Sequence, residues 1–463
     1  MLLTLATLLA AALRLPFLDH QSLWFDEIYT RDVLGESSLA GLWHHIRATE
    51  STPPLYYLLA WGWTGVLGRG AAAMRAIPAL ALVAAVPVSY TAFRRLIGQR
   101  VALATAALVA VSPILVSYST DARSYGLFVL TALLSVWGFS VVLERGSRRD
   151  HALWALASVA CIWTHYFGGF VVGGEVIVLL VLRSRTRGRI QVLVSAAAVV
   201  LCSLPLLPLL LDQTGDERAA FIAGIPLRAR LTATVRQFAM GPNVPRTWLE
   251  AAGIAILAVA LVAGAVMTAR SGRMGTALVS LTAFVFLAPL LLGAVGIEDR
   301  FYARNVVAAV PLGLALAAPA LLRLGAVPLV AYLALALLTS IWVATDWRYE
   351  QLDWGGALAR VEAIGQRIPV VLPAGLNEPV VRTYLGRHAV RSLTASRAWI
   401  TVEPIRAPGH RALGPAAPTP LPAGFAAVRE IDVHGFRLEL IVAPRPLPIV
   451  SGQPGVVSVL PGG

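Results

Sequence analysis

Long apolar runs recur along the chain from the N-terminus to about Thr345. Most have roughly 15 to 22 residues, close to the ~20 that a helix needs to cross ~30 Å of hydrocarbon. The pattern predicts an all-α polytopic membrane protein with about eleven spanning helices. The predicted spans are residues 2–18, 76–93, 101–119, 124–143, 151–165, 167–182, 190–211, 250–269, 275–295, 305–322 and 325–344.

One further apolar run, PPLYYLLAWGWTGVLG at 53–68, is short and rich in aromatic residues, which is typical of the membrane interface. Short basic loops decide how to interpret it. If 53–68 does not cross, all of these loops lie on one side together with the N-terminus, as the positive-inside rule requires. We therefore predict an interfacial, juxtamembrane or re-entrant helix, with an ordinary twelfth span as the alternative. The basic loops are 93–100, 144–150, 183–189, 269–274 and 322–325.

This topology predicts three parts of the chain. Residues 1–345 form the transmembrane domain, with a first outer loop at 19–75. Residues 346–443 are more polar and predict a small extracytoplasmic α/β domain, and residues 444–463 a Pro/Gly-rich disordered tail.

Local patterns predict elements within the C-terminal domain. Residues 368–373 are typical of a strand and residues 377–386 of a short helix. The runs GFAAVREI and FRLELIVA flank DVHG as the two arms of a hairpin.

Composition agrees with a membrane protein. The 463 residues are 57% hydrophobic and only 14% charged, whereas about a quarter of the residues of a soluble domain are charged. The formal net charge of +13 does not indicate nucleic-acid binding, because much of it falls in the short loops that set topology. No nucleotide-binding loop is present. Cys161 and Cys202 lie inside apolar runs, where neither a disulfide nor a zinc site is expected.

Polar residues concentrate at the predicted outer ends of the helices, and such residues near membrane depth usually face a cavity or a partner. The asymmetry predicts an outward-facing cavity lined with carboxylates, arginines and one histidine. The residues concerned are Asp26, Glu27, Asp121, Arg123, His165, Tyr166, Glu298, Asp299, Arg300, Tyr302, Arg304 and Asn305.

Such a cavity suits a substrate with a lipid tail and an anionic head group. The planar guanidinium of arginine binds phosphate through paired, charge-assisted hydrogen bonds. A neighbouring carboxylate can accept the proton of a hydroxyl nucleophile, which contributes ~10²–10⁴-fold in rate. The residue types therefore indicate group transfer from a lipid phosphate, on the outer face and without nucleotide.

An ordered set of motifs resembles the family 39 and aminoarabinose-transferase-like glycosyltransferases, related to protein O-mannosyltransferases, in an actinobacterial-looking branch. The motifs are Trp-x-Asp-Glu after the first span, PPLYY, SPILVSYSTDARSYGLF, THYF, ARNVVAAVP and DWGGAL (353–358). The resemblance covers 1–345 and the start of the C-terminal part. It implies a GT-C fold and transfer of a sugar from a polyprenyl-phosphate donor on the extracytoplasmic side, usually with inversion at the anomeric carbon.

The resemblance also implies roles for single residues. Asp26 matches the first-loop aspartate and is expected to be the general base for the acceptor hydroxyl, or to orient it. Glu27 is expected to orient an arginine, cap the following helix turn or bind the sugar. Arg304 stands where an arginine meets the donor phosphate, with Arg300 and Arg123 as alternatives.

Other residues have less definite expected roles. At Asn305 many relatives have tyrosine, so its role stays open. His165 and Tyr166 are expected to bind the phosphate, to hold a divalent cation such as Mg²⁺ or Mn²⁺ together with a carboxylate such as Asp26, or to anchor the interface. A mid-membrane glutamate, Glu175, is a functional candidate, with structural pairing to a polar neighbour or protonation as the alternatives. Six residues are expected to shape the rim of the cavity beside the lipid, namely Pro53, Pro54, Tyr56, Tyr57, Asp121 and Asn305.

The sequence thus predicts an inverting glycosyltransferase in a bacterial plasma membrane, with its site and C-terminal domain outside the cell. Its partners are a polyprenyl-phosphate sugar, the bilayer, and a lipid, glycan or protein acceptor. A transporter or flippase of lipid-linked sugars is one alternative, although it predicts charges along a path through the spans. A non-catalytic sugar-lipid-binding subunit is the other.

Overall fold

The computed structural model divides into two compact units. The first contains Met1–Leu18 and Val33–Ile341, and the second contains Asp19–Asp32 and Trp342–Gly463. The beginning of the predicted outer loop therefore groups with the C-terminal domain and not with the helices that flank it. The structure describes residues 1–182, 186–214, 220–244, 246–297, 299–349, 352–362, 370–371, 380, 383–384, 389–390, 392–402, 413–415, 421–450 and 458–461.

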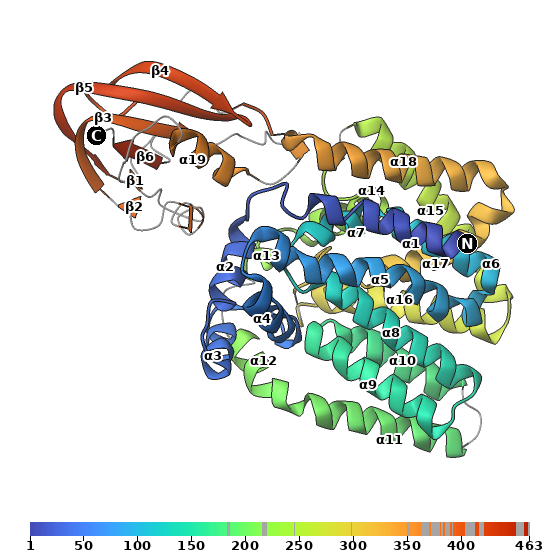
Figure 1. Ribbon diagram of the computed structural model, residues 1–463. Helices are drawn as coiled ribbons and strands as arrows, with labels where there is room; N and C mark the ends of the chain where they lie inside the picture. Colours follow the sequence, from blue (N-terminus) through green and yellow to red (C-terminus); the bar gives the residue numbers. More distant parts are fainter. Residues whose placement is uncertain are drawn as a thin grey trace. The chain divides into compact units, whose positions relative to one another are not determined.

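The first unit is a bundle of helices, and each predicted span lies mainly in helix (Figure 1). Helix α8 packs between α5 and α9, and α17 packs against α15 and α6. The elements are α1 Leu2–Ala12, η1 Leu15–Phe17, α3 Leu39–Thr49, α4 Leu55–Leu67, α5 Ala71–Ile97, α6 Gln99–Val111, α7 Pro113–Ser117, η2 Tyr118–Thr120, α8 Tyr125–Glu144, α9 Arg148–Thr164, α10 Gly168–Leu182, α11 Thr186–Ser203, η3 Leu204–Leu206, α12 Leu207–Thr214, α13 Ala220–Ala223, α14 Leu227–Met240, α15 Thr247–Arg270, α16 Arg273–Ala294, α17 Ala309–Arg323 and α18 Ala326–Thr345, of which α18 runs into the second unit.

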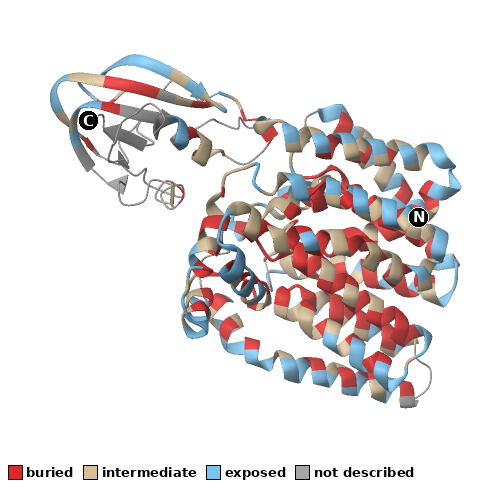
Figure 2. Cartoon of the chain, viewed as in Figure 1, coloured by how far each residue is buried: buried red, intermediate tan, exposed pale blue. Residues whose placement is uncertain are grey.

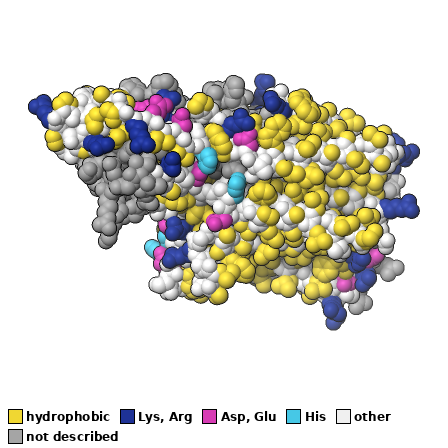
Figure 3. All heavy atoms as spheres, turned by 45° about the horizontal axis from the view of Figure 1, so that its top comes forward, with side chains coloured by type: hydrophobic (Ala, Val, Ile, Leu, Met, Phe, Trp, Pro, Cys, Tyr) yellow, Lys and Arg dark blue, Asp and Glu magenta, His cyan; other side chains and the backbone are white. Residues whose placement is uncertain are grey.

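Several of these helices suit a bilayer. Among the described residues, six are long and apolar enough to cross a membrane, or seven if a bent pair counts as one span. Helix α8 is central, with 83% of its apolar window buried, whereas α15 has 22% buried and presents exposed residues (Figure 2). Hydrophobic side chains also cover a broad band of the bundle surface (Figure 3). The chain is therefore a multi-pass membrane protein, and the predicted number of eleven spans stays a prediction.

A buried arginine stabilises the break between α6 and α7, which are bent by 48°. Pro113 has no N–H, so the carbonyl of Val109 has no partner within the helix. Arg14 donates hydrogen bonds to the carbonyls of Ala110 at 2.8 Å and Val109 at 3.4 Å. Its side chain is fully buried, so these bonds satisfy polar groups that water does not reach.

The ambiguous aromatic run forms helix α4, Leu55–Leu67. Its 13 residues give a helix about 20 Å long, shorter than the ~30 Å hydrocarbon core. This length agrees with an interfacial helix, which remains a prediction.

The second unit contains helix α2, Phe25–Val33, up to Asp32, and a six-stranded sheet with the order β2-β1-β6-β3-β5-β4. The predicted hairpin is confirmed, because β4 and β5 pair antiparallel around the two-residue turn His434–Gly435. Trp354 is buried and meets the ring of Phe436 edge to face at 4.9 Å. The other elements are η5 Trp347–Tyr349, α19 Trp354–Glu362, β1 Val370–Val371, β2 Ala389–Val390, β3 Ser392–Val402, β4 Ala426–Val433, β5 Phe436–Val450 and β6 Ser458–Pro461.

The C-terminal predictions hold in part. Strand β1 falls within the strand predicted at 368–373, whereas most of the helix predicted at 377–386 lies outside the described residues. The predicted disordered tail differs from the structure, because β5 continues through Pro444 to Val450 and β6 follows at Ser458–Pro461. Pairing with β3 accommodates the prolines, since Pro448 keeps its place in the β3–β5 register opposite Thr394.

Candidate functional site

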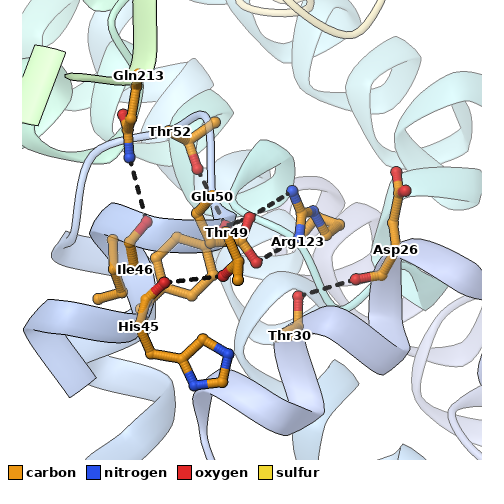
Figure 4. Close-up of polar contacts among 10 residues, drawn as sticks. Asp26, Thr30, His45, Ile46, Thr49, Glu50, Thr52, Arg123 and Gln213 are labelled. Atoms are coloured by element: carbon orange, nitrogen blue, oxygen red, sulfur yellow. Dashed lines mark hydrogen bonds and ion pairs between the residues drawn. The ribbon is translucent and has the colours of Figure 1, made fainter. Parts of the chain in front are cut away.

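A buried ion pair joins two segments of the first unit (Figure 4). Both ends of the Arg123 guanidinium meet the carboxylate of Glu50, at 3.1 Å for Nη1–Oε1 and 2.8 Å for Nη2–Oε2. The Glu50 side chain is only 1% exposed, and that of Arg123 is 10% exposed. This two-pronged contact fixes the orientation of the guanidinium, because both members of the pair are planar. Arg123 therefore pairs with Glu50 in the structure.

Two further residues extend this pair. The Tyr57 hydroxyl donates to Glu50 Oε2 at 2.5 Å and lies 3.1 Å from the Thr52 hydroxyl. Burial raises the pKa of Tyr57 well above its ordinary value, against the opposing charge of Arg123, so the phenol stays protonated. Tyr56 and Tyr57 are fully buried and meet edge to face at 5.2 Å, and Pro54 is also buried. These residues form part of the interior and do not face outward as rim residues would.

His165 ends helix α9 and is 3% exposed. Its ring stacks on Phe128, with centroids 4.6 Å apart. Nδ1 accepts a hydrogen bond from the backbone N–H of Phe167 at 3.2 Å, so the neutral ring carries its proton on Nε2. That Nε2 is buried and contacts no hydrogen-bond partner in the described part of the chain. His165 therefore presents a buried donor that an anionic or carbonyl oxygen would satisfy.

Aromatic rings lie close to His165. The ring of Tyr125 lies 6.1 Å from that of His165 and 5.1 Å from that of Tyr118. These ring contacts bring together side chains that are up to 47 positions apart in the sequence (165 − 118).

Tyr166 and Arg300 belong to the same region. The Tyr166 hydroxyl donates to Gln213 Oε1 at 2.8 Å, and burial raises its pKa against the opposing charge of Arg300. Gln213 in turn donates to the carbonyl of Ile46 at 3.4 Å (Figure 4). Tyr166 therefore has a structural partner, and the Gln213 contact ties α12 to α3.

The segment before α17 holds Arg304 against aromatic rings. Its guanidinium lies 5.4 Å from the Phe221 ring and 5.6 Å from the Tyr302 ring, within cation–π range. The Asn305 side chain donates to the carbonyl of Arg300 at 2.8 Å, which gives it a role in shaping this turn.

Two acidic residues of this region have defined partners. Asp299 pairs with Arg230 at 2.5 Å and not with Arg300. Asp121 is partly exposed, and its carbonyl accepts from the backbone N–H of Arg123 at 2.7 Å. Both contacts shape the turns from which Arg123 and Arg300 extend.

Asp26 and Glu27 occupy the first turn of α2. Glu27 is fully buried, and its Oε2 accepts from the backbone N–H of Trp24 at 3.3 Å. Helix capping, one of the roles predicted for Glu27, is thus observed. The carbonyl of Asp26 accepts from the Thr30 hydroxyl at 3.2 Å (Figure 4).

The two carboxylates belong to the second unit, whereas Arg123, His165 and Arg304 belong to the first. Their meeting with the arginines therefore stays a prediction.

Two observations concern the predicted divalent cation. Among the residues that the structure describes, no three His, Cys, Asp or Glu side chains gather as metal ligands would. The Nδ1 contact of His165 also favours the tautomer with a protonated Nε2, which cannot coordinate a cation. A divalent cation remains a prediction that the structure does not test.

Glu175 lies apart from this cluster. Its Oε2 accepts from the Ser135 hydroxyl at 2.6 Å and the Trp154 indole at 2.8 Å, and Ser135 also lies 3.0 Å from the Ser158 hydroxyl. The carboxyl therefore joins α8, α9 and α10, as the structural alternative predicted.

Sequence reasoning missed Glu50. It is an acidic residue just before Pro53–Pro54, in a chain of which only 14% is charged. An isolated acid beside an apolar run was the available signal, since such a group needs a partner. Its partner 73 positions away could not be identified from spacing.

Comparisons with known proteins place this geometry in context. Residues 51–208, about a third of the chain, match the family model described as dolichyl-phosphate-mannose-protein mannosyltransferase. The matched part includes Glu50's partner Arg123 as well as His165 and Tyr166. A comparison with curated proteins gave no match.

Solved structures show a shared fold. ArnT from Cupriavidus metallidurans bound to undecaprenyl phosphate is 15% identical, with 82% of this chain and 84% of that chain covered and a TM-score of 0.56. Its apo state is 13% identical, with the same coverage and a TM-score of 0.55. An oligosaccharyltransferase from Archaeoglobus fulgidus is 14% identical over 75% of this chain, with a TM-score of 0.49, and the chain spans 54% of that protein's length. The likeness to ArnT shows the fold, which is the GT-C fold that the sequence resemblance implies.

Proposed function

We propose that this protein is a glycosyltransferase that moves a sugar from a polyprenyl-phosphate donor to an acceptor hydroxyl on the extracytoplasmic face. One observation carries the proposal. The Nε2–H of His165 is a buried donor that contacts no hydrogen-bond partner in the described part of the chain, in a bundle whose apolar helices are long enough to cross a membrane. A buried donor of this kind is suited to a phosphate oxygen.

The comparisons support the same class of reaction. The matching family model describes a mannosyltransferase that uses a lipid-phosphate sugar, and the ArnT structure contains undecaprenyl phosphate. Fold likeness alone does not transfer a substrate, so the sugar and the acceptor stay open.

The proposed reaction is a single displacement with inversion. Asp26 takes the proton of the acceptor hydroxyl as its oxygen bonds to the anomeric carbon. The bond between that carbon and the phosphate oxygen breaks, and the polyprenyl phosphate leaves with the electron pair. Arg304, with Arg300 or Arg123, neutralises the leaving phosphate, while His165 donates a hydrogen bond to it. Stabilising this negative charge is expected to be the larger contribution to the rate.

The test is transfer of radiolabelled sugar from a polyprenyl-phosphate donor by the purified protein in lipid nanodiscs. Asp26→Asn is expected to abolish transfer and leave donor binding intact, whereas Asp19→Asn, an exposed aspartate of the same unit, is expected to retain activity. Full activity of Asp26→Asn would exclude its role as base.

The arginine assignment has its own test. Arg304→Ala is expected to weaken binding of polyprenyl phosphate, with the exposed Arg228→Ala as the control. Unchanged binding would remove Arg304 from the phosphate site. The same assay with a chelator, followed by Mg²⁺ or Mn²⁺, tests the predicted cation.

The two alternatives predict other outcomes. A flippase would move the labelled lipid between leaflets without releasing or transferring sugar. A non-catalytic subunit would bind the lipid and leave the label on it. Transfer to an acceptor by the purified protein excludes both.

A further inference from the structure

A short strap, defined as Ser22–Trp24, leads into helix α2 and makes specific contacts within the second unit. The backbone N–H of Leu23 donates to the Tyr384 hydroxyl at 2.7 Å. The Ser22 hydroxyl donates to the carboxylate of Asp353 and accepts from the backbone N–H of Gly355 at 2.9 Å. The strap is thus held at two consecutive residues by groups more than 300 positions away in the chain.

Asp353 is the centre of these contacts. Its Oδ1 accepts from Ser22 and from the backbone N–H of Gly356 at 3.0 Å, which caps helix α19, and its Oδ2 lies 2.8 Å from His434 Nδ1. Burial by itself would raise the pKa of Asp353, but the hydrogen bonds from Ser22, Gly356 and His434 hold it below its usual value. The carboxylate is therefore charged and fully engaged at neutral pH.

Glycine at position 355 lets the backbone of α19 come close to Ser22. A Cβ added there would lie 2.6 Å from Ser22 Oγ and 3.0 Å from the Tyr384 ring. The structure thus explains the glycine in the DWGGAL motif, because the backbone of α19 must pass close to the strap.

The hairpin turn aims His434 at Asp353. His434 has φ of +47°, the only positive value for a non-glycine among the described residues, and the His-Gly pair forms the tight turn between β4 and β5. Its ring also stacks on Trp347, with centroids 5.9 Å apart. The positive φ belongs to this tight turn and places the largely exposed His434 side chain against Asp353.

The three residue types do not form a hydrolytic triad. In a triad, histidine lies between serine and aspartate and takes the serine proton. Here Asp353 lies between Ser22 and His434, so the serine hydroxyl donates to the carboxylate and the imidazole contacts the other carboxylate oxygen. The arrangement holds a segment in place and does not activate a nucleophile.

We propose that the C-terminal sheet domain positions the helix that carries Asp26 and Glu27, with Ser22, Asp353 and Tyr384 as positioning residues. The strap ends one residue before α2, so any shift of Ser22 or Leu23 moves the first turn of that helix. The catalytic consequence rests on the proposed function, in which Asp26 takes the acceptor proton. A displacement of about 1 Å at a reacting group can cost ~10² in rate.

Hydrogen exchange of residues 22–33 in the full-length protein tests the positioning without any assay of transfer. Ser22→Ala and Tyr384→Phe each remove one anchor, and exchange of this segment is expected to become about tenfold faster in each. Ser38→Ala is the matched control, because its hydroxyl accepts from Gly41 within helix α3 and not from the second unit. Rates within about twofold of the wild type in both variants would overturn the proposal, whatever the activity.

Kinetics test the consequence for the reaction. Both variants are expected to lose about tenfold to a hundredfold in kcat, with little change in KM for the donor, since the predicted phosphate residues lie in the other unit. Faster exchange with unchanged kcat would also overturn the proposal, because the strap would then have no effect on the reaction. If the wild-type protein had no transferase activity, the proposed function would be refuted, but not the positioning of α2 by the C-terminal domain. The hydrogen-exchange rates would still decide whether that domain holds α2 in place.

Discussion

Replacing Glu50 by leucine removes the carboxylate that Arg123 contacts with both ends of its guanidinium. The contacts measure 3.1 and 2.8 Å, and both side chains are at least nine-tenths buried. Removing one partner of a buried ion pair costs about 3–5 kcal/mol, because the remaining charge stays in a poorly solvated place. Glu50→Leu is therefore expected to lower the free energy of unfolding by about that amount.

The double variant distinguishes this explanation from loss of packing. Replacing both members of a buried pair by apolar residues of similar volume is often nearly neutral. Glu50→Leu with Arg123→Met is thus expected to be clearly more stable than Glu50→Leu alone. The coupling energy is the sum of the costs of the two single variants minus the cost of the double variant. If each single variant costs about 3–5 kcal/mol and the double variant costs less than either, this coupling energy is at least about 3 kcal/mol.

Equilibrium unfolding in mixed detergent and SDS micelles, followed by tryptophan fluorescence, measures these values. The Arg95–Glu144 pair is the control, because its glutamate side chain is 43% exposed whereas that of Glu50 is 1% exposed, and its coupling is expected to be at most about 1 kcal/mol. A coupling for Glu50 and Arg123 no larger than the control would refute the reasoning. The double variant is also expected to bind polyprenyl phosphate more weakly despite its stability, which separates the two roles of Arg123.

Three further predictions concern other buried contacts. His165→Asn keeps an acceptor near the Phe167 N–H but loses the Nε2 donor. Its binding of polyprenyl phosphate, measured by calorimetry, is expected to weaken about tenfold to a hundredfold, and the loss of binding is expected to be smaller in His165→Gln. Arg14→Met leaves the carbonyls at the α6 break without their hydrogen-bond donor, and is expected to lower the free energy of unfolding in SDS by about 2–4 kcal/mol. Replacing the exposed Arg100 by Met is expected to change it by no more than about 0.5 kcal/mol. Because the pKa of Asp353 is lowered in the folded protein, its contribution to stability is present above about pH 4 and is lost as the pH falls through the folded-state pKa. Hydrogen exchange of residues 22–33 in the wild type is therefore expected to accelerate in that pH range. An equal acceleration in Asp353→Asn would show that protonation of Asp353 is not the cause.

Much of the fold followed from local patterns. The apolar runs form helices because, in lipid, a backbone must satisfy its own hydrogen bonds. The hairpin around His434–Gly435 followed from alternating residues on both sides of a glycine-containing turn. The strand through Pro444–Val450 did not, because its pairing with β3 depends on a partner far away in the chain.

The candidate site was partly predictable. Placing the basic loops on one side leaves Arg123, His165 and Arg304 at the opposite helix ends, and in the structure His165 has a buried Nε2 donor. The orientation of the histidine was not predictable, since it depends on the backbone N–H of Phe167. Neither was the role of Glu50, because a charged residue in a loop has the same local appearance whether it is solvated or buried.

The sequence by itself determined where the helices lie, which side chains carry charge and which helix ends they occupy. These properties depend on neighbours a few residues apart and on the bilayer, whose thickness sets the length of an apolar run. Only the tertiary structure decided that Glu50 orients Arg123 and that Asp353 anchors Ser22, 331 positions away. Such pairs form between segments that packing brings together, and many alternative partners satisfy the same local pattern, so their choice is a property of the folded chain.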